Sequence, residues 1–236
     1  MMKNIIYLTV IFFSACMSPT SKSVETSFSD KPAYTIDHLI LAINDLDKGM
    51  AEFSAMTGVK PVFGGAHPHS FTHNALVSLG DNIYLEIMAP RPQATNVPQE
   101  FKSYEHLTPV GWAIHSPAIQ ATERLLTEQG FAVDSIRAGA RQKPDGQQLT
   151  WSTLGLAEVL SDYDPFFIQW GAGSTHPSVN SPSGCTLQMV QWSLTKPERF
   201  KKLLGTLNLK GDVVNSANGE DRMRISLRTP KGVANF

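Results

Sequence analysis

Cysteine is scarce in this chain, with Cys16 and Cys185 as its two cysteines among 236 residues. A secreted fold held by disulfides carries an even set of cysteines within its folded part, so a disulfide scaffold is excluded. An excess of positive charge is missing as well, because 20 Lys and Arg stand against 21 Asp and Glu and no basic run occurs. A nucleic-acid partner requires a concentrated basic face, and the sequence excludes one.

The amino-terminal apolar stretch is too short to cross a bilayer, which takes about 20 helical residues. It spans residues 5–13, follows Lys3, and leads into Phe13-Ser14-Ala15-Cys16. This arrangement predicts a cleavable export signal over residues 1–15. The four residues resemble the lipobox of bacterial lipoproteins, although Phe13 stands where that pattern has Leu.

The lipobox resemblance implies that Cys16 carries a lipid, which would anchor the protein to the bacterial cell envelope, facing the periplasm. Ordinary signal cleavage nearby, with Cys16 lost, is the alternative. Residues 16–33 are rich in Ser and Thr and predict a flexible tether. Cys185 lies in an apolar strand-like run and is interpreted as a buried small hydrophobe.

The rest of the chain, residues 34–236, repeats one pattern. An apolar strand at 36–43 leads to Asn44-Asp45, which can cap a helix that Gly58 ends. Three strands follow at 59–63, 71–79 and 82–89, and the short corner Gly80-Asp81 predicts that the last two form a hairpin. The order is βαβββ.

The same order returns twice. The second pass has a strand at 110–115, a helix begun by Ser116-Pro117, and strands at 133–138, 148–154 and 166–170. The third has a strand at 185–192, a capping box at Thr195-Lys196-Pro197-Glu198, a helix ending at Gly205, and strands at 209–214, 223–228 and 233–236. We therefore predict an α+β domain of modules at about 36–90, 107–171 and 185–236, which share a core.

Several local strings sharpen this prediction: Asp37-His38 opening the first strand, residues 74–80 leading to 84–87, residues 165–171, and His176-Pro177. They resemble the glyoxalase-like domain proteins of the vicinal oxygen chelate superfamily, over residues 36–230. The resemblance implies that two modules curl a mixed sheet into a cradle. Metal ligands would project into it from the first and last strands of each module.

Strand periodicity tests that ligand set. If Leu39, Leu41 and Ile43 face the helix, then His38 faces the cradle, and the same alternation places Tyr84 and Glu86 there. In the second module, Phe166, Ile168 and Trp170 are expected under the helix, which puts Gln169 in the slot equivalent to Glu86. The fourth ligand position, the equivalent of His38 in the second module, falls on Pro109, whose side chain has no donor atom for a metal. The predicted metal ligands are His38, Glu86 and Gln169.

The histidines at 67, 69 and 73 are interpreted as part of a loop at the cradle mouth, with solvated surface residues as the alternative. The substrate pocket is predicted to include His69, His73, Tyr84, His115 and Phe167. Core packing is the alternative for Phe167. For His38 the alternative is a core histidine, for Glu86 a water-exposed edge position, and for Gln169 a structural amide.

Two functions stay open on these residues. The first is a metal-dependent lyase or isomerase of glyoxalase type, in which zinc, iron, nickel or manganese polarises two neighbouring substrate oxygens and Glu86 acts as ligand or base. The second is a metal-free module that binds and sequesters a small apolar compound. Oxygen-dependent ring cleavage lacks the second strand histidine that it requires.

Overall fold

The first sheet contains both of the first two repeats. A computed structural model describes residues 34–67, 70–142 and 146–236. Within them the first repeat comprises β1 (Thr35–Ala42), α1 (Leu46–Thr57), β2 (Val62–Ala66), β3 (Thr72–Gly80) and β4 (Ile83–Pro90). After α2 (Gln99–Ser103), the second comprises β5 (Thr108–His115), α3 (Ile119–Glu128), β6 (Arg137–Gln142), β7 (Gln148–Leu154) and β8 (Phe166–Trp170).

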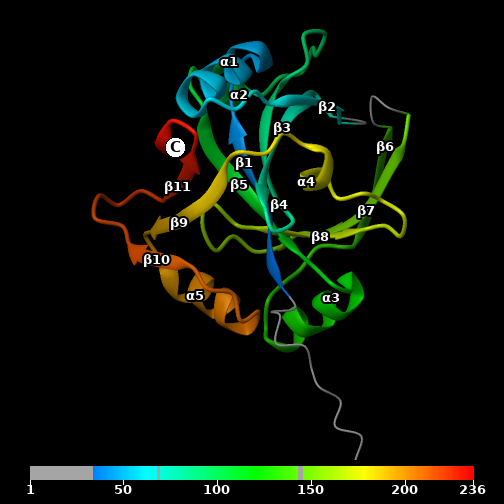
Figure 1. Cartoon of the computed structure of the whole chain (residues 1–236). Coiled ribbons are helices and arrows are strands. Elements are labelled where there is room, and N and C mark those ends of the chain that lie inside the picture. The colour runs from blue at the N-terminus through cyan, green and yellow to red at the C-terminus, as the bar shows by residue number, and fades with distance from the viewer. Residues whose placement is uncertain (1–33, 68–69, 143–145) are drawn as a thin grey trace, which may run out of the picture. The chain divides into compact units, whose positions relative to one another are not determined.

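These strands form one mixed sheet in the order β2-β3-β4-β1-β5-β8-β7-β6. Inside each repeat the first strand pairs parallel with the last, and the repeats join where β1 and β5 run antiparallel. The edge strands β2 and β6 come together, because Arg141 of β6 donates a hydrogen bond to the carbonyl of Gly64 in β2 (Figure 1). The prediction of an α+β fold with βαβββ modules around a curled sheet is confirmed.

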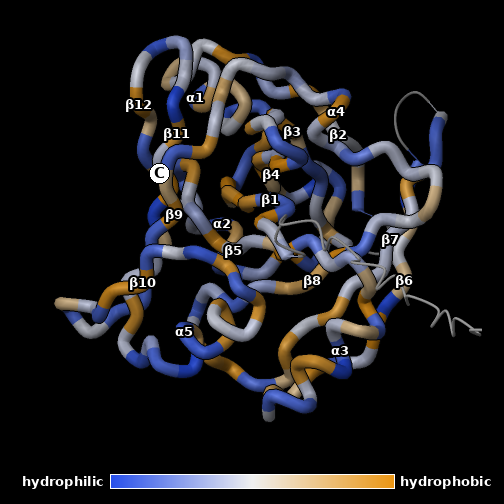
Figure 2. Tube along the Cα trace, turned by 60° about the horizontal axis from the view of Figure 1, so that its bottom comes forward, coloured by the Kyte–Doolittle hydropathy of each residue, from blue (hydrophilic) through white to orange (hydrophobic). Residues whose placement is uncertain are grey.

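The first repeat has the predicted order of elements, although its second strand runs over Val62–Ala66 rather than 59–63 and its hairpin turns one residue after the expected corner Gly80-Asp81. Asp45 caps α1 by accepting a hydrogen bond from the Lys48 backbone N–H at 2.8 Å, and Gly58 ends the helix with φ +80°. The β3–β4 hairpin turns through Asp81 and Asn82, with φ values of 47° and 60° that suit a two-residue turn. The core lies between α1 and the sheet, and the hydrophobic residues of β1, β3 and β4 gather there (Figure 2).

The second helix begins differently from the prediction. Its N-cap is Ala118, and Ser116 instead hydrogen-bonds the hydroxyl of Thr122 at 2.7 Å. The first free backbone N–H, that of Ile119, donates to the side-chain oxygen of Gln169 at 2.7 Å. A side chain from β8 therefore caps α3, a long-range arrangement that the local sequence does not reveal.

The third repeat has the expected elements but a different sheet. After α4 (Pro177–Asn180) it comprises β9 (Thr186–Leu194), α5 (Pro197–Thr206), β10 (Asp212–Asn215), β11 (Arg222–Thr229) and β12 (Gly232–Asn235). In the described chain these strands form a separate sheet ordered β10-β9-β11-β12, with β10 rather than the last strand parallel to β9. The expected capping box is absent, because Thr195 hydrogen-bonds Asp221.

Aromatic packing holds the third repeat against the first sheet. Trp112 of β5 packs on Trp192 of β9 with ring centroids 4.7 Å apart, and Trp192 packs on Phe200 of α5 at 5.4 Å. All three rings are buried, as is Cys185, which is part of the same core as expected. The first two modules therefore form the cradle, and the third supports it from outside.

Residues 1–33 lie outside the described residues, and with them the expected signal segment, Cys16 and tether. Within the described chain, which belongs to the compact unit Pro32–Phe236, the helices are too short or too polar to span a bilayer.

Phe200→Ala should destabilise the protein by about 3–5 kcal/mol, because a fully buried aromatic ring leaves a cavity between α5 and the first sheet. The free energy of unfolding from urea denaturation measures this. Val159→Ala, at a side chain that is 85% exposed, is the control and should change it little. An equal effect of the two substitutions would show that the aromatic contact does not hold the third repeat.

Candidate functional site

A cavity of about 320 Å³ lies inside the curve of the first sheet. Its polar wall comes mainly from the first module, and its apolar wall comes mainly from the second. The lining residues are His38, Ile40, His67, Asn74, Tyr84, Glu86, Met88, Arg141, Trp151, Thr153, Phe166, Ile168 and Trp170.

The first module places its side chains as strand alternation predicts. Leu39 and Leu41 are fully buried in the core, whereas His38 faces the cavity together with Tyr84 and Glu86 of β4. The distance from His38 Nε2 to the nearer Glu86 oxygen is 3.7 Å. The histidine and the carboxylate therefore share one hollow, as expected.

The second module has the opposite alternation from the one predicted. Phe166, Ile168 and Trp170 line the cavity, while Phe167 is fully buried in the core. Gln169 points to the helix side, where it caps α3. The predictions of Gln169 as a cradle ligand and Phe167 as a pocket residue are wrong. Because this cavity wall is itself apolar, the hydrophobic pattern of β8 does not distinguish its two faces.

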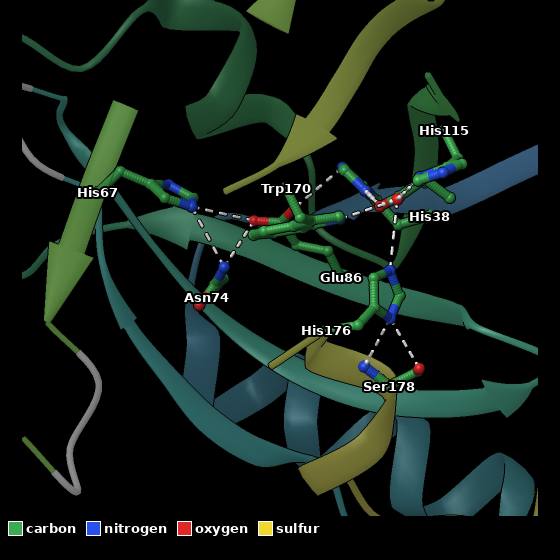
Figure 3. A network of polar contacts seen from close by, with 9 residues as sticks. His38, His67, Asn74, Glu86, His115, Trp170, His176 and Ser178 are labelled. Atoms are coloured by element: carbon green, nitrogen blue, oxygen red, sulfur yellow. Dashed lines mark hydrogen bonds and ion pairs between the residues drawn. The ribbon is translucent and has the colours of Figure 1, made fainter. Parts of the chain in front are cut away.

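Glu86 is held by two hydrogen-bond donors at one of its oxygens. Asn74 Nδ2 donates to Oε1 at 2.7 Å, and His67 Nε2 lies 3.1 Å from the same oxygen (Figure 3). Asn74 is oriented in turn by Arg141, which lies 3.5 Å from its Oδ1. Oxygen Oε2 faces His38, so Glu86 keeps one carboxylate oxygen directed at the imidazole.

Glu86 stays ionised although it is only 6% exposed. Burial by itself raises the pKa of a carboxyl group. The hydrogen bond and charge of His67, the charge of His38 and the Asn74 hydrogen bond outweigh it and lower the pKa of Glu86 to about 2. A fixed negative charge therefore lies beside His38 at neutral pH.

Asp37 is the second buried carboxylate, and three histidines, which Figure 3 labels, lie around it. His38 Nδ1 lies 2.8 Å away, His176 Nε2 3.3 Å and His115 Nδ1 3.8 Å, and the indole N–H of Trp170 donates at 2.9 Å. Burial raises the pKa of Asp37, but hydrogen bonds from the histidines hold it well below its ordinary value. Asp37 is therefore an acceptor only.

The hydrogen bond to Asp37 fixes the orientation of the His38 imidazole. Since ionised Asp37 can only accept, His38 donates its Nδ1 hydrogen, and Nε2 is the atom left for the cavity. The ring stacks on Tyr84, with centroids 4.6 Å apart and an interplanar angle of 24°. His38 is thus held on its edge and on its face.

Tyr84 contributes a hydroxyl to the same wall. Among the described residues none accepts a hydrogen bond from it, although the residue is buried and lines the cavity. Burial, together with the charges of Glu86 and Asp37, raises the pKa of Tyr84 well above its ordinary value. The phenol therefore keeps its proton and is a free donor.

The remaining predicted pocket histidines lie elsewhere. His73 is on the opposite face of β3 and lines a different cavity beside the start of α1, so its predicted place in the pocket is wrong. His115, 41% exposed, lies at the Asp37 end rather than in the cavity wall. His69 lies outside the described residues.

The donor set of this cavity does not fit the divalent metal that the superfamily often uses. The second module offers Phe166, Ile168 and Trp170 where the resemblance requires ligands. In the first module, His38 and His67 approach opposite oxygens of Glu86. Across residues 34–67, 70–142 and 146–236, no three His, Cys, Asp or Glu side chains are arranged to hold a metal ion.

Sequence reasoning did not assign Asp37, Asn74, Arg141 or His176 to the site. Alternation places Asp37 on the face opposite His38, but a β-bulge between Ile36 and His38 brings both side chains to one cluster. Arg141 reaches the cavity from the far edge of the sheet. The local signals present were the adjacent Asp37-His38, the stretch 74–80 that contains Asn74, and His176-Pro177.

Comparison with known proteins agrees with this architecture. Residues 36–207 match the family described as a glyoxalase-like domain. A hypothetical protein from Staphylococcus aureus is similar in structure with a TM-score of 0.60 and 18% identity, covering 86% of this chain and 85% of that one. At this identity the similarity concerns the fold alone.

Methylmalonyl-CoA epimerase from Mycobacterium tuberculosis has a TM-score of 0.44 at 16% identity, covering 61% of this chain and 93% of its own. The Streptomyces coelicolor epimerase in complex with 2-nitronate-propionyl-CoA has a TM-score of 0.43 at 16% identity, covering 58% and 97%. No curated protein matches this chain.

Glu86→Gln should make the protein less sensitive to acid. Because the pKa of Glu86 is lower in the folded protein, its charge contributes stability above about pH 4.5, and that contribution is lost as the pH falls towards 2. Between pH 5.5 and pH 2 the wild type should lose about 3 kcal/mol more unfolding free energy than the variant. Denaturant titrations at both pH values measure the difference, and the exposed Glu198→Gln is the control. Parallel losses in wild type and Glu86→Gln would contradict the assigned environment.

Proposed function

The chain belongs to the glyoxalase-like domain family, and we propose that it binds a small organic molecule in the cavity and moves a proton on that molecule with Nε2 of His38. The observation that carries this proposal is the array Asp37–His38–Glu86, in which an oriented imidazole lies between two buried, ionised carboxylates. Such a group in a largely apolar cavity suits general base catalysis.

The proposed step removes a proton from a carbon next to a carbonyl group. His38 Nε2 takes the proton, the C–H electron pair forms a carbon–carbon double bond, and the carbonyl electrons move to oxygen to give an enolate. Returning the proton to the opposite face of the same carbon completes an epimerisation, and returning a solvent-derived proton to the same face completes an exchange. Asp37 at Nδ1 and Glu86 near Nε2 stabilise the imidazolium that forms.

The enolate oxygen needs a hydrogen-bond donor, and Tyr84 supplies one. Its hydroxyl keeps its proton, lines the cavity and has no partner among the described residues. A donor prepared in a water-poor cavity stabilises a developing oxyanion more than it does a neutral carbonyl. Glu86, expected as ligand or base, has in this proposal an electrostatic role towards His38.

A metal-free binding module is the second candidate. The apolar side chains of Ile40, Met88, Phe166, Ile168 and Trp170 favour it, because they suit a small apolar or aromatic compound whether or not a reaction follows. Metal-assisted chemistry on a vicinal-oxygen substrate is not supported by the donor set of the cavity.

The proposed location rests on sequence alone. The signal over residues 1–15 and the lipobox-like residues before Cys16 support an exported, lipid-anchored protein at the bacterial envelope. The tether at 16–33 would hold the folded domain off the membrane.

His38→Gln should abolish proton transfer. The probe is 1-phenyl-2-propanone in D₂O, an aromatic ketone with acidic C–H bonds next to its carbonyl, and the readout is deuterium incorporation by NMR. The wild type should accelerate exchange, and the variant should be slower by about 100-fold or more because the base is gone. The exposed His106→Gln is the matched control. An exchange rate in His38→Gln equal to that of the wild type would contradict the catalytic proposal. A wild type that binds the ketone without accelerating exchange would favour the sequestering module.

Metal removal should leave the exchange rate unchanged. Elemental analysis of the purified protein should find less than stoichiometric zinc, iron, nickel and manganese, because the cavity lacks a three-ligand set. Exchange is then compared before and after dialysis against EDTA. If the protein holds one metal ion per chain, and EDTA removes both this ion and the exchange activity, the function is metal-dependent and this prediction is wrong.

A further inference from the structure

Arg141 carries a buried positive charge. It lies on β6, its residue is only 8% exposed, and it lines the candidate cavity. Its hydrogen bonds go to the carbonyl of Gly64 and, at 3.5 Å, to Oδ1 of Asn74. Both use one nitrogen, Nη1. Arg141 Nε and Nη2 have no hydrogen-bond partner in the part of the chain that the structure describes.

Among the described residues the guanidinium also lacks a carboxylate partner. Within the described residues the acidic groups of Asp37 and Glu86 pair with histidines, and none lies within ion-pair distance of Arg141. A buried charge is costly unless an opposite charge or a full set of hydrogen bonds compensates it. Among the described residues, neutral acceptors contact one nitrogen, and Nε and Nη2 are left open to a ligand.

The backbone around Arg141 is shaped to admit this side chain. A Cβ atom on Gly65, whose φ is +126°, would lie 2.8 Å from Nη1 of Arg141. A Cβ atom on Gly64 would clash with Oδ1 of Asn74, which Arg141 contacts. The glycine pair therefore leaves room for the guanidinium between the sheet edges.

A second cavity meets the first at Arg141. Its volume is about 190 Å³, and its wall is largely apolar, with Val62, Phe63, Leu76, Leu149 and Pro177. Arg141 is the residue that lines both cavities. Its unpaired donors are therefore accessible to a ligand although the side chain is buried.

We infer that Arg141 binds the carboxylate of an apolar monocarboxylic acid, an inference that rests on the proposed function of the cavity. The planar guanidinium presents paired N–H donors that match the two oxygens of a carboxylate. A single negative charge fits better than two, because ionised Glu86 lines the same cavity and repels further charge. The aromatic wall of Trp151, Phe166 and Trp170 suits an apolar body.

The test compares an acid with a neutral analogue. Phenylpyruvate and 1-phenyl-2-propanone share the benzyl ketone, and the first adds the carboxylate. By isothermal titration calorimetry, the wild type should bind phenylpyruvate about tenfold or more tightly than the ketone. Arg141→Met should remove that preference, so that within the variant phenylpyruvate binds no more tightly than the ketone. Arg137→Met, an exposed arginine on the same strand, should behave as wild type.

Equal binding of the two probes by the wild type, or an acid preference that persists in Arg141→Met, would overturn the inference. If Arg141→Met does not fold, as judged by circular dichroism, Arg141→Lys replaces it. Lysine keeps the charge without the planar fork, so the acid preference should shrink, and an unchanged preference counts against the inference.

The two proposals fail separately. His38-dependent exchange of the ketone with no acid preference overturns the carboxylate site and leaves the proposed function standing. An acid preference lost in Arg141→Met, together with exchange that does not depend on His38, supports the carboxylate site and overturns proton transfer. A wild type that binds neither probe overturns both.

Discussion

The hydrogen bond between buried Asp37 and Nδ1 of His38 organises the candidate site. It fixes which imidazole nitrogen faces the cavity, and after the hydrogen bonds of His115 and His176 it helps to keep the pKa of Asp37 low and its carboxylate charged despite burial. The same carboxylate accepts from Trp170 of the second module and from His176, the N-cap residue of α4. One residue at the start of β1 thus ties three distant segments together, and the cavity wall depends on this tie as much as on strand pairing.

The two modules have similar folds but different chemistry. The first places His38, Asn74, Tyr84 and Glu86 at the cavity, whereas the second contributes mainly aromatic and aliphatic side chains. A symmetric ligand set, as the superfamily resemblance implies, would need polar donors from both. The division instead gives one wall that can exchange protons and one that can hold an apolar body, which is a coherent arrangement for a small organic ligand.

The sequence predicted the repeated architecture and the meeting of His38 with Glu86, because strand periodicity is unambiguous where one face is core and the other carries polar residues. It failed at β8, where both faces are apolar and alternation assigned Gln169 and Phe167 to the wrong sides. The bulge at Asp37 changes the alternation by one residue. Arg141 was missed because its role arises from closure of the sheet, which brings together strands far apart in sequence.

The curled sheet does not close completely at its two edge strands. In the described chain no backbone ladder joins β2 to β6, so side-chain contacts of Arg141 bridge the seam between the modules. Parting the seam there breaks no strand pairing among the described residues and removes only the two hydrogen bonds of Arg141 named above. Both contacts use Nη1 alone, so a carboxylate held by Nε and Nη2 leaves the seam bridged, and one side chain can close the sheet and recognise a ligand.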